Sequence, residues 1–305
     1  MSLHKNKQMN RRKFISNIGI VGGSQLLFNI PFINKANSLF VSEKITVQQI
    51  IDRFIQDVPG GAAKETVDTI KVGSANTEVK SIVTTMFATI EVIKQTIAKG
   101  ANFMIVHEPT FYNHEDKTEW LKNDEVFNYK YDLLTKNNIT VWRCHDYVHR
   151  LRPEPVTAAT YEQLEWNKYV DDKANVVAHI PTMPLQNVIA HFKKKLNIEK
   201  VRYIGDLNQT CKTTLLIPGA AGKDMHIGFM KQFKPDVLIC GELSEWETAE
   251  YIRDARAMGN NIALIILGHA PSEEAGSEFM LQWLKKNYPS IPAYHIPSGS
   301  PLKFE

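Results

Sequence analysis

The amino-acid sequence predicts an α/β protein made of two similar three-layer halves, each containing a mixed sheet. From about residue 44 onward, short apolar runs alternate with longer segments whose apolar residues have helical spacing. This βαβ order is typical of parallel or mixed sheets covered by helices. The chain has 305 residues, 43% of them hydrophobic, and is therefore long enough to bury two cores.

The first half is expected over residues 44–150. It begins with a helix over residues 45–58, in which Ile50, Ile51 and Phe54 share one face, and Pro59 follows that helix. The remaining elements are expected in the order strand, helix, strand, helix, strand, at residues 81–87, 90–98, 103–106, 124–136 and up to residue 144.

Residues 151–175 contain Pro153 and Pro155 and predict a covering segment or boundary with a helix at 157–166. The second half is expected over residues 176–305, and it repeats the alternation of the first half. Its strands are predicted near residues 176–180, 201–204, 212–217, 236–240 and 263–267. Its helices are predicted at residues 185–196, 224–233, 248–258 and 272–287.

The N-terminal region differs from the rest of the chain. Residues 1–38 carry six basic side chains and no acidic one, so the formal net charge of +3 becomes −3 for the remainder. A mildly acidic body argues against nucleic-acid binding, which favours a basic stripe. The three cysteines, Cys144, Cys211 and Cys240, each lie in or beside an apolar run and cannot form a disulfide framework.

The run from Arg11 to Ile15 (Arg-Arg-Lys-Phe-Ile) resembles a twin-arginine export signal, so residues 1–43 are interpreted as a signal and linker. This predicts a periplasmic or otherwise exported protein. The alternative is a disordered basic tail on a cytoplasmic protein. The apolar stretch at residues 18–32 is too short and polar to span a bilayer stably, and no other stretch reaches spanning length.

Three short motifs carry the chemistry, and each follows an apolar run that is expected to be a buried strand. They are His107-Glu108-Pro109, His145-x-x-x-His149 and His269-x-x-x-Glu273. Ligands and catalytic groups of open α/β sheets lie at the carboxyl ends of strands. Imidazoles and carboxylates are also the ligands that first-row metal ions prefer. We therefore expect a metal centre, although each motif by itself is common, and His114 could lie nearby or be solvated.

The motifs and their surroundings resemble the Nif-three-like dinuclear metal-centre family, some of whose members are named GTP cyclohydrolase type 2 homologues. The resemblance covers roughly residues 45–305, and it rests on the runs 68–73, 98–109, 236–242 and 268–273. It implies a two-domain α/β fold, a site for two divalent metal ions between the domains, and homohexamers. Zn, Fe and Mn are the candidate ions. The family's ligand positions correspond to His107, Glu108, His149, His269 and Glu273, with His145 as a possible additional site residue.

Two of these positions depart from the family pattern. The family has His-His-Pro where this chain has Glu108 as the second residue, and it has Asp where this chain has His149. The exchange keeps three imidazoles and two carboxylates, so the compensating charge of −2 is unchanged. We therefore expect a retained but rearranged site.

Hydrolysis of a small, unidentified substrate, which could be phosphorylated, is the reaction expected of a two-metal site. Glu242 and Glu245 are the candidate catalytic residues, acting as a general base or as acceptors behind the ligands. Arg150 and Arg152 could bind an anionic substrate or lie solvated at the surface. The alternative function is a non-enzymatic metal-binding assembly for storage, sensing or scaffolding, because a fold does not fix a function.

Overall fold

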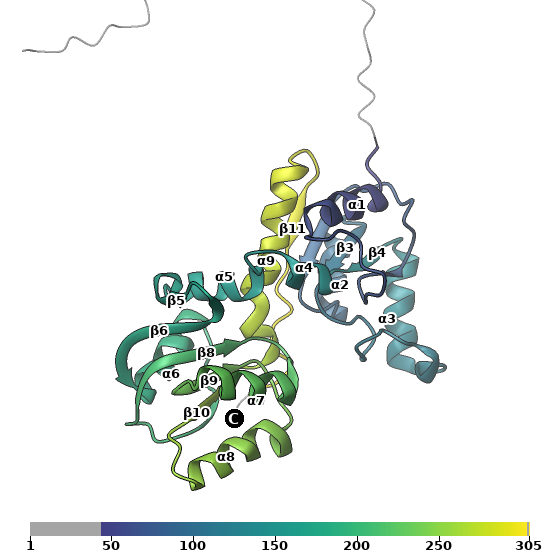
Figure 1. The fold of residues 1–305 in the computed structure, drawn as a ribbon. Coiled ribbons are helices and arrows are strands. Elements are labelled where there is room, and N and C mark those ends of the chain that lie inside the picture. The colour runs from purple at the N-terminus through teal and green to yellow at the C-terminus, as the bar shows by residue number, and fades with distance from the viewer. Residues whose placement is uncertain (1–43, 304) are drawn as a thin grey trace, which may run out of the picture. The chain divides into compact units, whose positions relative to one another are not determined.

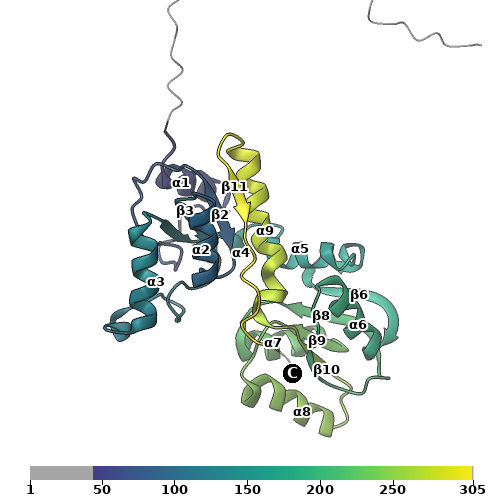
Figure 2. The same cartoon turned by 180° about the vertical axis from the view of Figure 1, so that it is seen from behind.

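The computed structural model describes residues 44–303 and 305, so the predicted export signal at residues 1–43 lies outside the described residues. The described chain is a mixed α/β protein with two sheets (Figures 1 and 2). The predicted fold class is confirmed.

The first sheet has four parallel strands and one antiparallel edge strand. Its order is β1 (Ile70–Val72), β4 (Thr140–Arg143), β3 (Phe103–Val106), β2 (Ile82–Thr85) and β11 (Ala293–His295). β2, β3, β4 and β11 run parallel, and β1 pairs with β4 in the antiparallel sense. Every residue of β2, β3 and β4 is buried, as expected of parallel strands covered on both faces.

The second sheet has a parallel centre between antiparallel neighbours. Its order is β5 (Val170–Asp171), β6 (Ala174–Pro184), β8 (Thr210–Ile217), β9 (Val237–Cys240), β10 (Ala263–Ile266) and β7 (Arg202–Ile204). Only β8, β9 and β10 are mutually parallel, and β9 and β10 are buried throughout. Because β9 and β10 are parallel neighbours, their carboxyl ends bring residues 241–242 and 268–269 to the same edge.

The predicted helices are all present, and their bounds lie close to the predicted ones. They are α1 (Val47–Asp57), α2 (Ile90–Ala98), α3 (Glu125–Lys136), α4 (Asp146–Arg150), α5 (Pro155–Gln163), α6 (Leu185–Lys195), α7 (Gly222–Phe233), α8 (Glu250–Ala257) and α9 (His269–Asn287), with short turns η1 (Glu119–Leu121), η2 (Asn167–Tyr169) and the π-helical η3 (Glu245–Ala249). α1 begins at a capping box in which the Thr46 hydroxyl accepts the Gln49 N–H and the Gln49 side chain accepts the Thr46 N–H.

Most helix starts lie within two residues of the prediction, and the differences at α5 and α9 have a physical reason. α5 begins at Pro155, two residues before the predicted start, because proline suits the first helical position and the Glu154 carboxylate accepts the N–H groups of Val156 and Thr157. α9 begins at His269 rather than at residue 272. Pro271 is tolerated there because it lies in the first turn, where the N–H groups have no partner within the helix.

The C-terminal part of the chain returns to the first sheet. α9 packs on α5 and on β2, and β11 then pairs with β2. Phe54 of α1 and Trp283 of α9 form an edge-to-face pair with ring centroids 5.0 Å apart in the core beside this sheet. The expected second half, residues 176–305, therefore contributes a strand to the first sheet. The boundary at 151–175 stays a prediction.

The three cysteines, Cys144, Cys211 and Cys240, are buried and form no disulfide, as expected. Within residues 44–303 and 305, no helix has the length and apolar character that crossing a membrane would need.

Candidate metal centre

Four side chains from two of the predicted motifs converge. His107 and Glu108 directly follow β3, whereas His269 and Glu273 lie in the first turns of α9. His269 Nε2 is 3.1 Å from Glu273 Oε2 and 3.3 Å from Glu108 Oε1. His107 Nε2 is 3.8 Å from Glu273 Oε2 and 4.0 Å from Glu108 Oε1. Both members of the adjacent pair, His107 and Glu108, therefore face one cluster.

The third motif brings two more imidazoles to the same place. His145 is the N-cap of α4 and His149 lies in its last turn, with their ring centroids 4.6 Å apart and each about 5 Å from the His107 ring. His145 Nε2 is 3.7 Å from Glu108 Oε1. Ligand atoms of two sets of residues lie within 4.8 Å of one another: His107 with His145 and His149, and His107 with Glu108 and Glu273. The possible additional residue His145 thus lies inside the cluster.

All four imidazoles have an oxygen acceptor at Nδ1. The pairs are His107 with the Cys144 carbonyl (3.2 Å), His145 with Asp146 (2.9 Å), His149 with Glu154 (3.2 Å) and His269 with Glu242 (3.3 Å). Because these oxygens only accept, a proton on each Nδ1 is favoured, and in the neutral ring Nε2 then remains free to bind a metal. This arrangement is typical of metal-binding histidines, whose second nitrogen is held by a carboxylate or a carbonyl.

The Nε2 atom of His107 supports the same interpretation. It is buried and has no hydrogen-bond partner among the described residues. An unpartnered buried nitrogen is costly unless a ligand takes its lone pair.

Charge in the cluster favours a cation. Burial lowers the pKa of His107 to about 4, although Glu273 and Glu108 oppose the shift. Burial also lowers the pKa of His269, but hydrogen bonds to Glu108, Glu242 and Glu273 outweigh it and raise that pKa well above its usual value. Burial raises the pKa of Glu108, yet the His269 hydrogen bond and the neighbouring histidines bring it well below the usual value. Glu108 thus stays ionised beside a position that attracts positive charge.

Asp68 holds the helix that carries two of the histidines. Its carboxylate accepts the backbone N–H groups of His145, Asp146 and Tyr147 at 2.7, 3.0 and 2.7 Å. Burial raises the pKa of Asp68 to about 6 despite these hydrogen bonds. Sequence reasoning used Asp68 only as part of the family resemblance and did not foresee this role, because the two segments are distant in the chain.

A buried arginine holds Glu108 from behind. Arg143, at the end of β4, is fully buried, and its NH2 atom is 3.6 Å from Glu108 Oε2. Its Nε donates to the His107 carbonyl at 3.2 Å, and its NH1 is 3.8 Å from Asp116 Oδ2. Glu108 therefore presents Oε1 to the histidines while Oε2 faces a fixed cation. Sequence reasoning also missed this residue.

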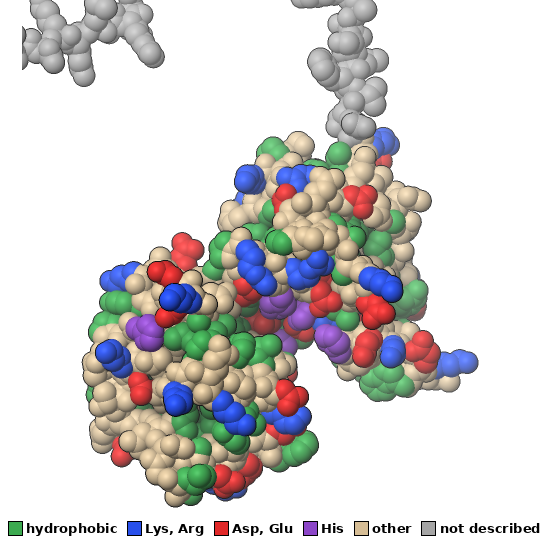
Figure 3. Space-filling view, in the orientation of Figure 1, with side chains coloured by type: hydrophobic (Ala, Val, Ile, Leu, Met, Phe, Trp, Pro, Cys, Tyr) green, Lys and Arg blue, Asp and Glu red, His purple; other side chains and the backbone are tan. Residues whose placement is uncertain are grey.

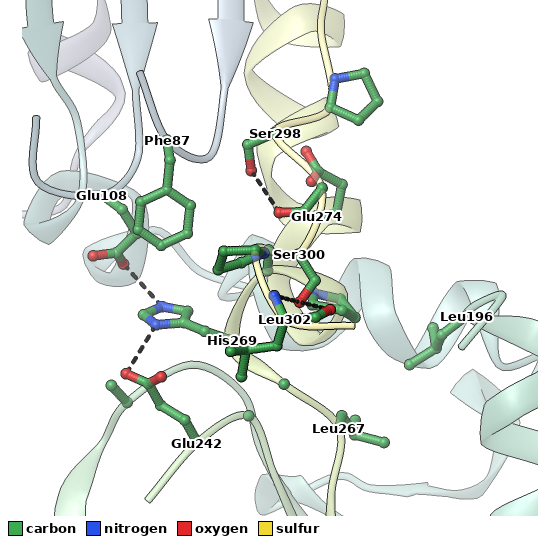
Figure 4. A pocket seen from close by; sticks show the side chains of 18 of the residues that line it. Phe87, Glu108, Leu196, Glu242, Leu267, His269, Glu274, Ser298, Ser300 and Leu302 are labelled. Carbon is green, nitrogen blue, oxygen red and sulfur yellow. Dashed lines mark hydrogen bonds and ion pairs between the residues drawn. The ribbon is translucent and has the colours of Figure 1, made fainter. Parts of the chain in front are cut away.

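The remaining predicted residues occupy different places. Glu242 lies beside His269, on the side opposite Glu108 (Figure 4). Glu245 instead pairs with Arg202, and its side chain is 71% exposed. The Arg150 guanidinium donates to the Pro59 carbonyl at 2.8 Å, and Arg152 donates to the carbonyls of His149 and Leu151. Sequence could not distinguish these outcomes, because each depends on a distant partner.

A large open cavity reaches the cluster. It has a volume of about 2280 Å³, and Glu108, Glu242 and His269 line it together with residues 297–303 of the C-terminal segment. Figure 3 shows histidine side chains gathered beside acidic ones in a recess of the surface. A small molecule can therefore approach the cluster from solvent.

The donor set fits first-row divalent metal ions. Four imidazoles and the side chains of Glu108 and Glu273 gather in one cluster, and nitrogen with carboxylate oxygen is a ligand set typical of Zn, Fe and Mn. These buried His and Glu clusters could hold a metal ion.

Comparison with known proteins identifies the family of the chain. The model of the Duf34/NIF3 (NGG1p interacting factor 3) family matches residues 45–298. The chain belongs to the DUF34/NIF3 family. It is 27% identical over 235 residues to a GTP cyclohydrolase 1 type 2 homolog from Clostridium perfringens, covering 73% of this chain and 85% of that protein. A second relative with the same description, from Clostridium acetobutylicum, is 26% identical over 232 residues, covering 72% and 82%.

Solved structures of the DUF34/NIF3 family show the same fold. The crystal structure of a Bacillus cereus protein related to NIF3 superposes with a TM-score of 0.69 at 16% identity, covering 87% of this chain and all of that chain. The predicted family is therefore confirmed.

Proposed function

We propose that this protein holds two divalent first-row metal ions and uses them to hydrolyse a small substrate. The observation that carries the proposal is the set of four histidines that each have an oxygen acceptor at Nδ1, beside the side chains of Glu108 and Glu273. Packing alone does not require four histidines in one cluster to be oriented in the same way through Nδ1. A single ion rarely uses six protein ligands of this type, and an open site also keeps a position for water or substrate.

The donors divide between two neighbouring positions in this proposal. Glu108, His269 and Glu273 would hold one ion, and His145 with His149 would hold the other. His107 lies between the two groups and would complete one of them. The two carboxylates offset part of the charge of two divalent ions, and the Nδ1 acceptors Asp146, Glu154 and Glu242 add further negative charge around the site.

When bound, divalent ions would lower the pKa of a water molecule and act as Lewis acids toward a carbonyl or phosphoryl oxygen. The chain's own residues do the positioning. Glu242 orients His269 through Nδ1 and also lines the cavity, so it can accept a proton from a reacting water. Glu245 has its own partner, Arg202, and we assign it no step.

Metal content tests the proposal first. Protein purified without chelator should carry one to two first-row ions per chain by elemental analysis, and His269→Ala or Glu273→Ala should each lose most of them. His179→Ala is the matched control, because His179 pairs with Asp171 at the surface. Full stoichiometry in both site variants would refute the centre.

The exchanged positions allow a second test. Glu108→His removes one negative charge from the site, whereas His149→Asp adds one, so the double variant should bind metal better than Glu108→His alone. Strict additivity of the two changes in a double-mutant cycle would show that the positions do not share a centre.

Turnover then separates hydrolysis from storage, sensing or scaffolding. Metal-dependent activity on panels of phosphoesters, nucleotides and amides supports hydrolysis, and metal binding without turnover supports the non-enzymatic assembly. We further propose a homohexamer, for which light scattering should give six times the chain mass of 34.7 kDa.

A further inference from the structure

Lys130 of α3 is a buried cation beside the candidate metal centre, and the metal proposal does not use it. Only 4% of the residue is exposed. Its Nζ donates to the Thr110 carbonyl at 2.5 Å, two residues after Glu108, and it lines the same cavity as Glu108 and His269. Because consecutive Cα atoms are about 3.8 Å apart, the loop that Nζ contacts begins within about 8 Å of Glu108 along the chain.

Within the described part of the chain, the ammonium group has no carboxylate at salt-bridge distance, and Asp116 acts on it only from further away. No carboxylate of residues 44–303 or 305 lies within 4.0 Å of Lys130 Nζ, whereas the neighbouring buried cations Lys71 and Arg143 share Asp116 at 3.3 and 3.8 Å. Nζ has three donors, and the Thr110 carbonyl uses one. Lys71 and Arg143 are therefore paired with carboxylates, whereas Lys130 is a buried cation without such a pair among the described residues.

Aromatic rings surround the remaining space. Nζ lies 5.0 Å from the Tyr112 ring centroid and 5.8 Å from that of Phe111. Tyr112 has a backbone φ of +67°, which is strained for a bulky side chain, and such strain concentrates at functional sites. The Phe111 N–H donates to Asp116 Oδ1 at 2.7 Å and helps hold this conformation. Burial lowers the pKa of Lys130 to about 8, so the amine is still largely protonated at neutral pH.

We propose that Lys130, with the Tyr112 ring as a wall, binds an anionic phosphate or carboxylate group of the small molecule that reaches the metal centre. An unpaired buried ammonium group beside an open cavity gains a charge-assisted hydrogen bond when such an anion binds. The inference rests on the proposed function for the identity of the neighbouring centre. The anion site itself depends on Lys130.

The test compares anion affinity among Lys130→Met, Lys130→Arg and the wild-type protein at equal metal content. Lys136→Met is the matched control, because Lys136 lies on the same helix and pairs with Asp132 in solvent. Titration calorimetry with inorganic phosphate should show affinity weakened about tenfold or more in Lys130→Met, since charged hydrogen bonds contribute that much. Lys130→Arg should retain most of the affinity, and Lys136→Met should match the wild type.

Acetate titrations identify the recognised group. Equal weakening for acetate supports carboxylate recognition, and weakening for phosphate alone supports phosphoryl recognition. Phosphate affinity in Lys130→Met equal to that of the wild type would overturn the proposal.

Chemical modification of the wild-type protein keeps the proposal testable if Lys130→Met does not fold. Phosphate should slow acetylation of Lys130 by acetic anhydride, read by mass spectrometry, and should leave Lys136 unaffected. The measurement is repeated after chelator treatment. Protection without metal supports the anion site even if the metal centre fails, and absence of protection in both samples overturns it.

Discussion

Replacing Arg143 with methionine should strongly destabilise the metal-free protein. The substitution keeps an unbranched apolar stem but removes a fully buried guanidinium. Two buried carboxylates then each lose a neighbouring cation: Glu108 Oε2, 3.6 Å from NH2, and Asp116 Oδ2, 3.8 Å from NH1. The carbonyls of His107 and His114 also lose their donors.

The magnitude follows from the burial of these groups. Removing one partner of a buried ion pair typically costs about 3–5 kcal/mol, because the remaining charge is left without compensation. Lys71, 3.3 Å from Asp116, keeps that carboxylate partly paired. Glu108 retains only the histidines. We therefore expect a loss of about 3 kcal/mol or more.

Urea unfolding in the presence of chelator measures this loss without the stabilisation that bound metal adds. Lys136→Met provides the control, because its exposed pair with Asp132 should contribute less than about 0.5 kcal/mol. Arg143→Lys should be intermediate, since an ammonium cannot reproduce the fork that reaches both carboxylates. A loss below about 1 kcal/mol for Arg143→Met would refute the view that Arg143 compensates buried charge.

Three further predictions concern other parts of the chain. Gly219→Ala should lose metal by elemental analysis, because its Cβ would lie 2.2 Å from Glu273 Oε1, whereas Gly222→Ala, equally at positive φ but facing open space, should keep it. Burial lowers the pKa of His226 to about 4 from 6.5, so the unfolded chain binds a proton first as pH falls, and stability is lost between about pH 6.5 and 4. His226→Leu should therefore remove about 2 kcal/mol of the stability difference between pH 7.5 and 5 in urea unfolding, and an unchanged pH slope would contradict this. Lysine replacement of the arginine pair at residues 11–12 should retain the protein in the cytoplasm by cell fractionation, and normal export would show that the segment is no twin-arginine signal.

Much of the fold could be predicted because local patterns decide it. The strand at residues 103–106 and the helix at 90–98 have the predicted bounds. The short strands β1 and β11 were missed, since three residues each carry too little periodicity to be recognised. Their place is fixed by pairing with β4 and β2, which are distant in sequence.

The candidate site divides in the same way. The sequence allowed four ligands to be proposed, because their motifs follow apolar runs and the carboxyl ends of parallel strands share an edge. These ligands are His107, Glu108, His269 and Glu273. Asp68, Arg143 and Glu154 could not be proposed as supporting groups, because buried polar partners depend on contacts between distant segments.

By itself, the sequence determined the class of fold, the family and the motifs from which a metal centre could be assembled, because hydrophobic periodicity and strand-end residues are local properties. Only the tertiary structure decided that His145 joins the cluster, that every imidazole has an Nδ1 acceptor, and that Glu242 faces His269 while Glu245 pairs with Arg202. These outcomes depend on which segments meet in space. The free-energy cost of an unpaired charge depends on its burial, and burial depends on several segments that are distant in the sequence.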